Sequence, residues 1–155
     1  MSEIPKYMIG RKRVAAGALL LNTDQRILLV NPPYKPQWEI PGGMVEEAES
    51  PLAACRREVL EEIGLAIHPG PLLSVGYLHD RGRGDALRFV FWGGVLEESA
   101  ISQIRLPVDE LSEYRFVTLA EASHLLLPTL HAQVAQALQN LQGGQQVYWE
   151  EASDA

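Results

Sequence analysis

Cysteine is almost absent from this sequence. The single Cys55 cannot form a disulfide within the chain, which excludes a small secreted domain held together by disulfides. Long hydrophobic runs are lacking too: the run from Ala15 to Leu21 is too short to cross a bilayer and too far from the start for a signal peptide. We therefore expect a cytoplasmic protein with no membrane partner.

Positive charge is in deficit. Lys and Arg number 13 against 20 Asp and Glu, which gives a net charge of −7 and a pI of about 5.1. Non-specific binding to nucleic acid needs a basic surface, so a nucleic-acid partner is not expected. A small anionic substrate is compatible with this charge if a metal ion supplies local positive charge.

Length and composition favour one folded domain. The chain has 155 residues, of which 46% are hydrophobic, enough for one core. We expect a single domain over residues 1–155, with a lead-in over 1–12 and a tail over 143–155. Tyr148 and Trp149 in the tail are expected to dock on the body or on another subunit, so a homodimer is one option.

Strand and helix patterns intermix along the chain. Strands are expected where β-branched and aromatic residues run between turn residues, and helices where apolar residues recur every three or four positions. The expected strands are 14–21, 26–30, 72–78, 86–96 and 114–117, the first two as a hairpin; the expected helices are 51–63, 119–126 and 129–141. Gly93-Gly94 indicates a bulge or a close backbone approach, and residues 97–106 are expected to be irregular. These patterns predict an α/β domain.

The helix over 51–63 has the clearest start and end. Ser50 is a favoured N-cap, Pro51 suits the first helical position, and Gly64 suits the position after the last turn. At about 100° per residue, one face is apolar and should be buried. That face consists of Leu52, Cys55, Val59 and Ile63.

Another face of this helix carries three carboxylates. Glu58, Glu61 and Glu62 are spaced i, i+3, i+4 and are therefore neighbours, with Arg57 one turn before Glu61. Carboxylates this close repel one another unless a cation lies among them, and Mg²⁺ prefers oxygen ligands. Taken alone, such a face is more often a solvated acidic surface than a metal site.

The segment before the helix changes this balance. Pro41-Gly42-Gly43 lets the backbone turn sharply and approach a ligand closely. From Gly43, through Glu49, to the run REVLEEIGL over residues 57–65, the residues and their spacing resemble the Nudix box. Residues 38–42 resemble its usual lead-in. On this resemblance the chain is identified as a member of the Nudix hydrolase family.

The resemblance implies a fold, an activity and a set of metal ligands. The fold is an α/β/α sandwich with a mixed β-sheet between helices. The activity is metal-dependent hydrolysis of a phosphoanhydride in a nucleoside diphosphate linked to another group, with Mg²⁺ or Mn²⁺ as the cofactor. Glu58 and Glu62 would be the principal ligands, Glu61 would join them directly or through water, and the Gly42 carbonyl would add a main-chain contact.

The resemblance also assigns supporting residues. Glu49 would pair with Arg57 and hold the loop against the helix. A later loop would supply an acidic residue as an extra metal ligand or general base; Glu110 is the first choice and Glu113 the second, with an ordinary surface charge as the alternative. Ala48 stands where many members have glycine, a departure expected to do little damage because this position does not define the motif.

Four residues outside the box are candidates for substrate binding. Tyr34 and Trp38 could stack on a nucleobase, with packing at the edge of the loop as the alternative and the favoured one for Trp38. Arg81 and Arg83 lie in a glycine-rich hairpin tip and could reach a substrate phosphate. A solvated tip is the alternative for both arginines and is favoured.

The substrate itself is left open by the sequence. Nucleoside triphosphates, including damaged ones, rank equal with nucleotide sugars and ADP-ribose. A non-catalytic nucleotide-binding or regulatory module is the alternative from another class, and the complete set of box glutamates argues against it. An RNA 5′-end pyrophosphohydrolase is a further alternative, and the acidic balance argues against that.

Overall fold

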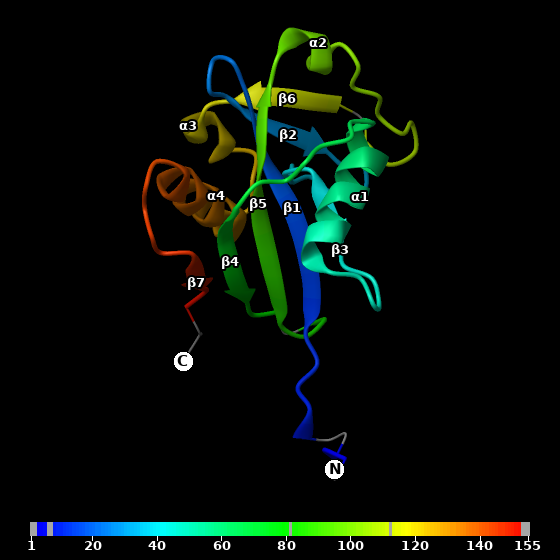
Figure 1. The fold of residues 1–155 in the computed structure, drawn as a ribbon, viewed down its shortest axis with the longest axis vertical. Helices are drawn as coiled ribbons and strands as arrows, with labels where there is room; N and C mark the ends of the chain where they lie inside the picture. Colours follow the sequence, from blue (N-terminus) through cyan, green and yellow to red (C-terminus); the bar gives the residue numbers. More distant parts are fainter. Residues whose placement is uncertain (1–2, 6–7, 81, 112, 153–155) are drawn as a thin grey trace.

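A computed structural model describes residues 3–5, 8–80, 82–111 and 113–152. Its centre is a seven-stranded mixed sheet in the order β6-β2-β1-β5-β4-β7, with β3 pairing to β1 (Figure 1). The strands are β1 (Arg13–Asn22), β2 (Ile27–Asn31), β3 (Gly42–Met44), β4 (Leu72–Leu78), β5 (Ala86–Leu96), β6 (Glu113–Val117) and β7 (Tyr148–Glu150). The helices are α1 (Pro51–Ile63), α2 (Glu98–Ile101), α3 (Leu119–Ala122) and α4 (Pro128–Leu141).

Strand β1 organises the sheet. It pairs antiparallel with β2, which confirms the predicted hairpin, and parallel with β5 along its whole length. The Asn22 side chain stabilises the hairpin turn by accepting from the backbone N–H groups of Asp24 and Arg26. Leu19 lies opposite Trp92 and Leu20 opposite Gly94, so Gly93 is the extra residue of the predicted bulge.

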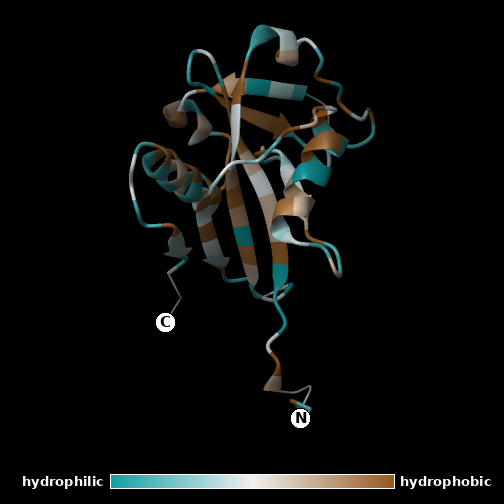
Figure 2. Cartoon of the chain, in the orientation of Figure 1, coloured by the Kyte–Doolittle hydropathy of each residue, from teal (hydrophilic) through white to brown (hydrophobic). Residues whose placement is uncertain are grey.

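Each face of the sheet is covered by a separate apolar layer. Helix α1 packs on one face through Cys55 and Val59, which are fully buried against residues such as Ala18 of β1. Helices α3 and α4 pack on the other face, where Val134 meets Leu19. Figure 2 shows β2 hydrophobic along most of its length, as expected for a strand enclosed on both faces. The α/β/α sandwich is therefore confirmed.

Helix α1 begins and ends where the sequence predicts. The Ser50 hydroxyl accepts from the Ala53 N–H at 3.1 Å, and Gly64 ends the helix in the left-handed conformation with φ of 73°. The predicted core face is wrong at one position: Leu52 is 42% exposed, and the buried residues begin at Ala54. Leu52 has the right angle around the axis, but it lies in the first turn, and burial begins two residues later, at Ala54.

Three local assignments differ from the sequence analysis. Residues 97–106 are not wholly irregular, because Glu98–Ile101 forms the short helix α2. The Pro-Gly-Gly segment is more than a turn, since Gly42–Met44 forms β3 and pairs with β1. Helix α3 stops at Ala122 instead of continuing to residue 126, although Thr118 does cap it in a capping box with Glu121.

The tail docks on the body. Strand β7 adds to the edge of β4 in parallel, with Trp149 opposite Gly76. The apolar stripe of α4 belongs to the core: Leu130 and Val134 are buried, while Leu138 and Leu141 pack against the same layer. Within the described part of the chain, no helix is both long enough and apolar enough to cross a membrane.

Ala48 provides a test of backbone strain in the loop between β3 and α1. Its φ is 61°, in the left-handed region that disfavours a residue with a Cβ, so the missing glycine costs more than the sequence suggested. We expect Ala48→Gly to raise the free energy of unfolding by about 1 kcal/mol in urea titration. Ala53→Gly, at an exposed helical site, is the matched control and should lower it by about 1 kcal/mol. Equal losses in both variants would contradict the strain assignment.

Candidate active site

The candidate active site is built on a close contact between β3 and β1. Gly42 and Gly43 lie opposite Gly17 and Ala16. A Cβ added at Gly42 would be 2.4 Å from the Ala16 carbonyl oxygen and 2.5 Å from the Gly17 Cα. Both are backbone atoms and cannot move aside, so only glycine permits this approach. The two glycines thereby leave room above the strand for side chains from α1.

Two of the box carboxylates fill that room. The Glu58 carboxyl group lies directly over Gly43, where an added Cβ would come within 2.4 Å of its Cδ. Glu62 accepts a hydrogen bond from the Gly42 N–H at 3.2 Å. Gly42 was predicted to act through its carbonyl; in this structure its N–H is the group engaged. Glu58 and Glu62 thus converge on the same three-residue strand.

Arg57 ties the loop and the helix together. Its Nε and Nη2 donate to the two oxygens of Glu49 at 2.8 and 2.9 Å, a bidentate pair that confirms the predicted contact. Nη1 donates to Glu58 at 3.0 Å and to Glu61 at 3.2 Å. Nη2 also donates to the Met44 carbonyl at 3.1 Å. One guanidinium therefore donates hydrogen bonds to three carboxylates and to β3.

The pKa values of the carboxylates separate according to burial and partner. The hydrogen bonds from Arg57 lower the pKa of Glu49 to about 2, so this group stays charged. Burial raises the pKa of Glu62, the hydrogen bond from Gly42 N–H opposes this shift, and the charge of Glu58 adds to it, with a net pKa of about 8. Burial also raises the pKa of Glu58, although Arg57 opposes that shift. The two carboxylates nearest β3 are thus the ones that most need added positive charge.

The oxygen donors suit a hard divalent cation. Glu58 and Glu62 are both desolvated, and Mg²⁺ or Mn²⁺ would favour their charged forms. Among the described residues, however, no three His, Cys, Asp or Glu side chains already surround a metal-sized space. Glu61 explains part of this, because its side chain is 54% exposed and is drawn to Arg57. Binding a cation here would require these carboxylates to turn toward it from their present partners.

Glu110 lies near this centre. It is exposed in the turn before β6, and its charge contributes to the raised pKa values of both Glu58 and Glu62. Glu113, the second choice, is the first residue of β6 and pairs with Arg115 at 3.6 Å. The structure thus leaves Glu110 as the more available carboxylate of the two.

Glu39 is a neighbour that the sequence analysis missed. It pairs with Val30 of β2, and its carboxylate forms an ion pair with Lys35. Its charge also contributes to the raised pKa of Glu62. Its alternation with the apolar Trp38 and Ile40 is a sequence signal for the opposite face, but its approach to Glu62 depends on the pairing with Val30, which no local pattern contains.

The two aromatic candidates have opposite environments. Tyr34 is 75% exposed. Its pKa is nevertheless raised, first by partial burial and then by the charge of Glu39, with Glu62 among the weaker causes. Its ring is therefore open to a ligand beside the acidic centre. Trp38 is only 7% exposed, with the Arg115 guanidinium 4.7 Å from its ring centroid. Trp38 thus offers no open face to a base, and its packing role is the one that fits.

Of the two hairpin arginines, the structure describes only Arg83, which lies apart from the acidic centre. Arg81 lies outside the described residues. Arg83 is 79% exposed at the tip between β4 and β5, where its Nε is 3.9 Å from Asp80. The tip lies at the end of the sheet where β1 begins, as Figure 1 shows. The solvated alternative therefore describes Arg83 better than a phosphate contact.

A half-buried apolar surface of the sheet extends from Gly43. Ala16, Phe89 and Val75 continue its row across β1, β5 and β4. Since paired residues on neighbouring strands share a face, this row lies on the same side as Glu58. Strands are about 4.8 Å apart, so Phe89 lies about 10 Å from Gly43. The half-buried side chains of this surface are Val14, Val75, Tyr77, Leu87 and Phe89.

Comparison with known proteins agrees with this geometry. The chain belongs to the NUDIX domain family, whose model matches residues 11–141. It resembles a putative 8-oxo-dGTP diphosphatase of Bacillus subtilis, at 47% identity over 49 residues, 32% of this chain and 33% of that protein. It also resembles an ADP-ribose pyrophosphatase of Methanocaldococcus jannaschii, at 34% identity over 93 residues, 57% of this chain and 55% of that protein.

These matches cover only part of the relatives. The chain spans about a third of the first protein and about half of the second. Among solved structures, the MutT protein of Methanosarcina mazei superposes with a TM-score of 0.71 at 23% identity, over 86% of this chain and 96% of that one. This structural likeness supports the fold, while the box residues connect the site to the family.

The raised pKa of Glu62 gives a test on the metal-free protein. Between its ordinary value of 4.5 and about 8, the folded state holds a proton that the unfolded state has lost, so stability falls as pH rises through this window. With chelator present, we expect Glu62→Gln to be more stable than the parent at pH 9 by a few kcal/mol, since one pKa unit is about 1.4 kcal/mol. The difference in free energy of unfolding between the variant and the parent should be smaller at pH 5.

Urea unfolding at the two pH values measures this difference. Glu61→Gln is the matched control, because the Glu61 side chain is 54% exposed and its charge needs no burial. If Glu62→Gln is less stable than the parent at pH 9, the charge of Glu62 does not lower the free energy of unfolding.

Proposed function

We propose that this protein is a divalent-cation-dependent hydrolase that cleaves a phosphoanhydride in a nucleoside diphosphate linked to another group. The observation that carries the proposal is the convergence of Glu58 and Glu62 on Gly42-Gly43, with Arg57 joining helix and loop. The family supports a metal-dependent reaction, since its hydrolases generally use divalent metal ions. We place the reaction in the cytoplasm, where a free thiol such as that of Cys55 stays reduced.

The residues of the centre have separate tasks in this reaction. Glu58 and Glu62 would hold Mg²⁺, or Mn²⁺, with Glu61 completing the oxygen shell. Such an ion neutralises phosphate oxygens and acidifies water. Arg57 keeps Glu58 over β3 and fixes the loop through Glu49, so the carboxylates meet the substrate in a preset arrangement.

A base is required to take the proton of the attacking water, and we assign it to Glu110. A general base works by reaching the proton that it removes, and Glu110 is a solvent-accessible carboxylate within electrostatic range of Glu58 and Glu62. The turn that carries it leaves it free to approach a bound substrate. Glu113 is engaged with Arg115 and is the weaker candidate.

The substrate would lie along the sheet from Glu58 toward Phe89. A nucleobase can stack on the half-buried surface around Phe89 and Tyr77, and about 10 Å separates this surface from Gly43. That distance suits a nucleoside whose diphosphate reaches the carboxylates. The relatives act, by their names, on 8-oxo-dGTP and on ADP-ribose, so oxidised nucleoside triphosphates and ADP-ribose are the first substrates to test.

A panel of substrates tests the activity. We expect one substrate among nucleoside triphosphates, 8-oxo-dGTP, ADP-ribose and nucleotide sugars to release product with Mg²⁺, and chelator to abolish the release. Glu62→Gln should lower turnover by about 10³-fold or more while the fold persists, because it removes a charged metal ligand. Product formation is measured by chromatography, and circular dichroism checks the fold.

Two results would contradict the proposal. Full activity of Glu62→Gln would show that this carboxylate does not hold the ion. Inactivity on every substrate, with tight binding of one nucleotide, would support the non-catalytic module instead. Leu60→Ala, at an exposed position on α1 between the two ligands, controls for a general disturbance of the helix and should retain activity.

The assignment of Glu110 is tested by the pH dependence of the rate. If Glu110 is the base, Glu110→Gln should lower turnover by about 10²-fold, as expected for loss of general base catalysis, and should remove the acid limb of the pH–rate profile. Glu113→Gln is the matched control and should keep both the turnover and the acid limb of the profile. An unchanged profile in Glu110→Gln would move the role to a carboxylate of α1.

A further inference from the structure

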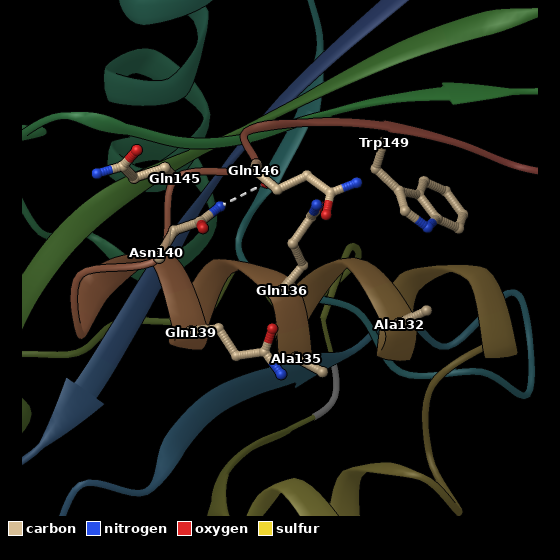
Figure 3. A pocket seen from close by; sticks show the side chains of 9 residues that line it. Ala132, Ala135, Gln136, Gln139, Asn140, Gln145, Gln146 and Trp149 are labelled. Carbon is tan, nitrogen blue, oxygen red and sulfur yellow. Dashed lines mark hydrogen bonds between the residues drawn. The ribbon is translucent and has the colours of Figure 1, made fainter.

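A groove lies between α4 and the tail, on the face of the sheet opposite to the box glutamates. Its volume is about 420 Å³, within the range of small-molecule sites. Figure 3 shows Gln136 of α4 and Gln146 of the tail beside Trp149. The groove presents five carboxamides and one indole, from Gln136, Gln139, Asn140, Gln145, Gln146 and Trp149, and its other lining residues are alanine and glycine.

The walls of this groove are held in place by hydrogen bonds. Asn140 donates to the Leu73 carbonyl of β4 at 2.7 Å and to the Gln146 carbonyl at 2.9 Å. Gln136 accepts from the Ser74 hydroxyl at 3.0 Å through Oε1, which leaves its amide nitrogen available. The helix, the sheet edge and the start of the tail are therefore linked before any ligand arrives.

The indole is positioned by the strand that carries it. Trp149 is paired with Gly76, and a Cβ added there would be 3.0 Å from the Trp149 ring. The glycine lets the ring approach the backbone of β4 closely, and Trp149 is half-buried. The part of the indole that β4 does not cover lines the groove.

Several carboxamides of the groove have unused hydrogen-bonding capacity. Within the described part of the chain, the side chains of Gln139, Gln145 and Gln146 make no hydrogen bond. A carboxamide presents a donor and an acceptor side by side. The edge of a nucleobase has the same arrangement, and Asn or Gln can pair with it through two bonds. An indole supplies a stacking surface for the same ring.

We propose that this groove is a second ligand site and that it binds the nucleobase of a nucleoside. The lining residues carry no formal charge. Recognition would therefore depend on the uncharged ring of the nucleobase and its polar edge, and a phosphate group would not contribute. The site is separate from the candidate active site, because α4 and α1 cover opposite faces of the sheet. This inference goes beyond hydrolysis and does not depend on it.

The test is a titration of the full-length chain with adenosine in chelator, followed by NMR of the side-chain amides and the indole N–H. We expect the Gln136, Gln146 and Trp149 signals to shift together, with a Kd below about 1 mM for a ligand of this size. Gln146→Ala should weaken binding about five- to tenfold, the loss of one to two hydrogen bonds, while keeping the backbone contact to Asn140.

Two control variants distinguish binding in this groove from binding at the candidate active site and from a general disturbance of α4. Gln142→Ala changes an exposed amide at the end of α4 that does not line the groove, and should bind adenosine normally. Glu62→Gln should also bind normally, even if it abolishes hydrolysis. The proposal is overturned if these signals do not respond to adenosine, if the shifts occur only around Phe89, Tyr77 and Glu58, or if glucose, which lacks a base, binds equally well.

Discussion

The guanidinium of Arg57 is the interaction on which the acidic centre depends. It binds Glu49 through two hydrogen bonds, and it also contacts Glu58, Glu61 and the backbone of β3. Without it, three carboxylates would repel one another across one turn of helix. Because its donors are fixed in one plane, the same residue that reduces this repulsion also sets where the loop and Glu58 stand.

Arg57 neutralises only part of the negative charge of the carboxylates, and the charge that remains defines the site. Glu49 receives the bidentate pair and stays charged, whereas Glu62 is half-buried and, among the described residues, has the Gly42 N–H as its hydrogen-bond partner. The structure therefore keeps a deficit of positive charge at one place, beside the two glycines of β3. A fold selected for stability alone would have no reason to bury a carboxylate there. The balance suits a centre that is completed by a cation from solution.

The sequence predicted what depends on local rules. Spacing and capping residues fixed the limits of α1, and the box located Arg57 with its carboxylate partners. The sequence did not predict features that depend on contacts between distant segments. Leu52 is exposed although it has the same angle around the helix axis as the buried residues, and Glu39 joins the acidic centre through its pairing with β2. The surface around Phe89 depends on the register of four strands, which no local pattern contains.

The parallel pairing of β1 with β5 also has a consequence for how the protein is made. Strand β1 leaves the ribosome early, but its central partner, Ala86–Leu96, follows only after α1 and β4 have been synthesised. During that interval one edge of a mostly apolar strand is unpaired, a state that invites association with other chains. The hairpin with β2 and the contact with β3 form from nearby sequence and can shield β1 during translation. The glycines that shape the acidic centre would then also protect β1 of the nascent chain from association, because they allow β3 to pair with it.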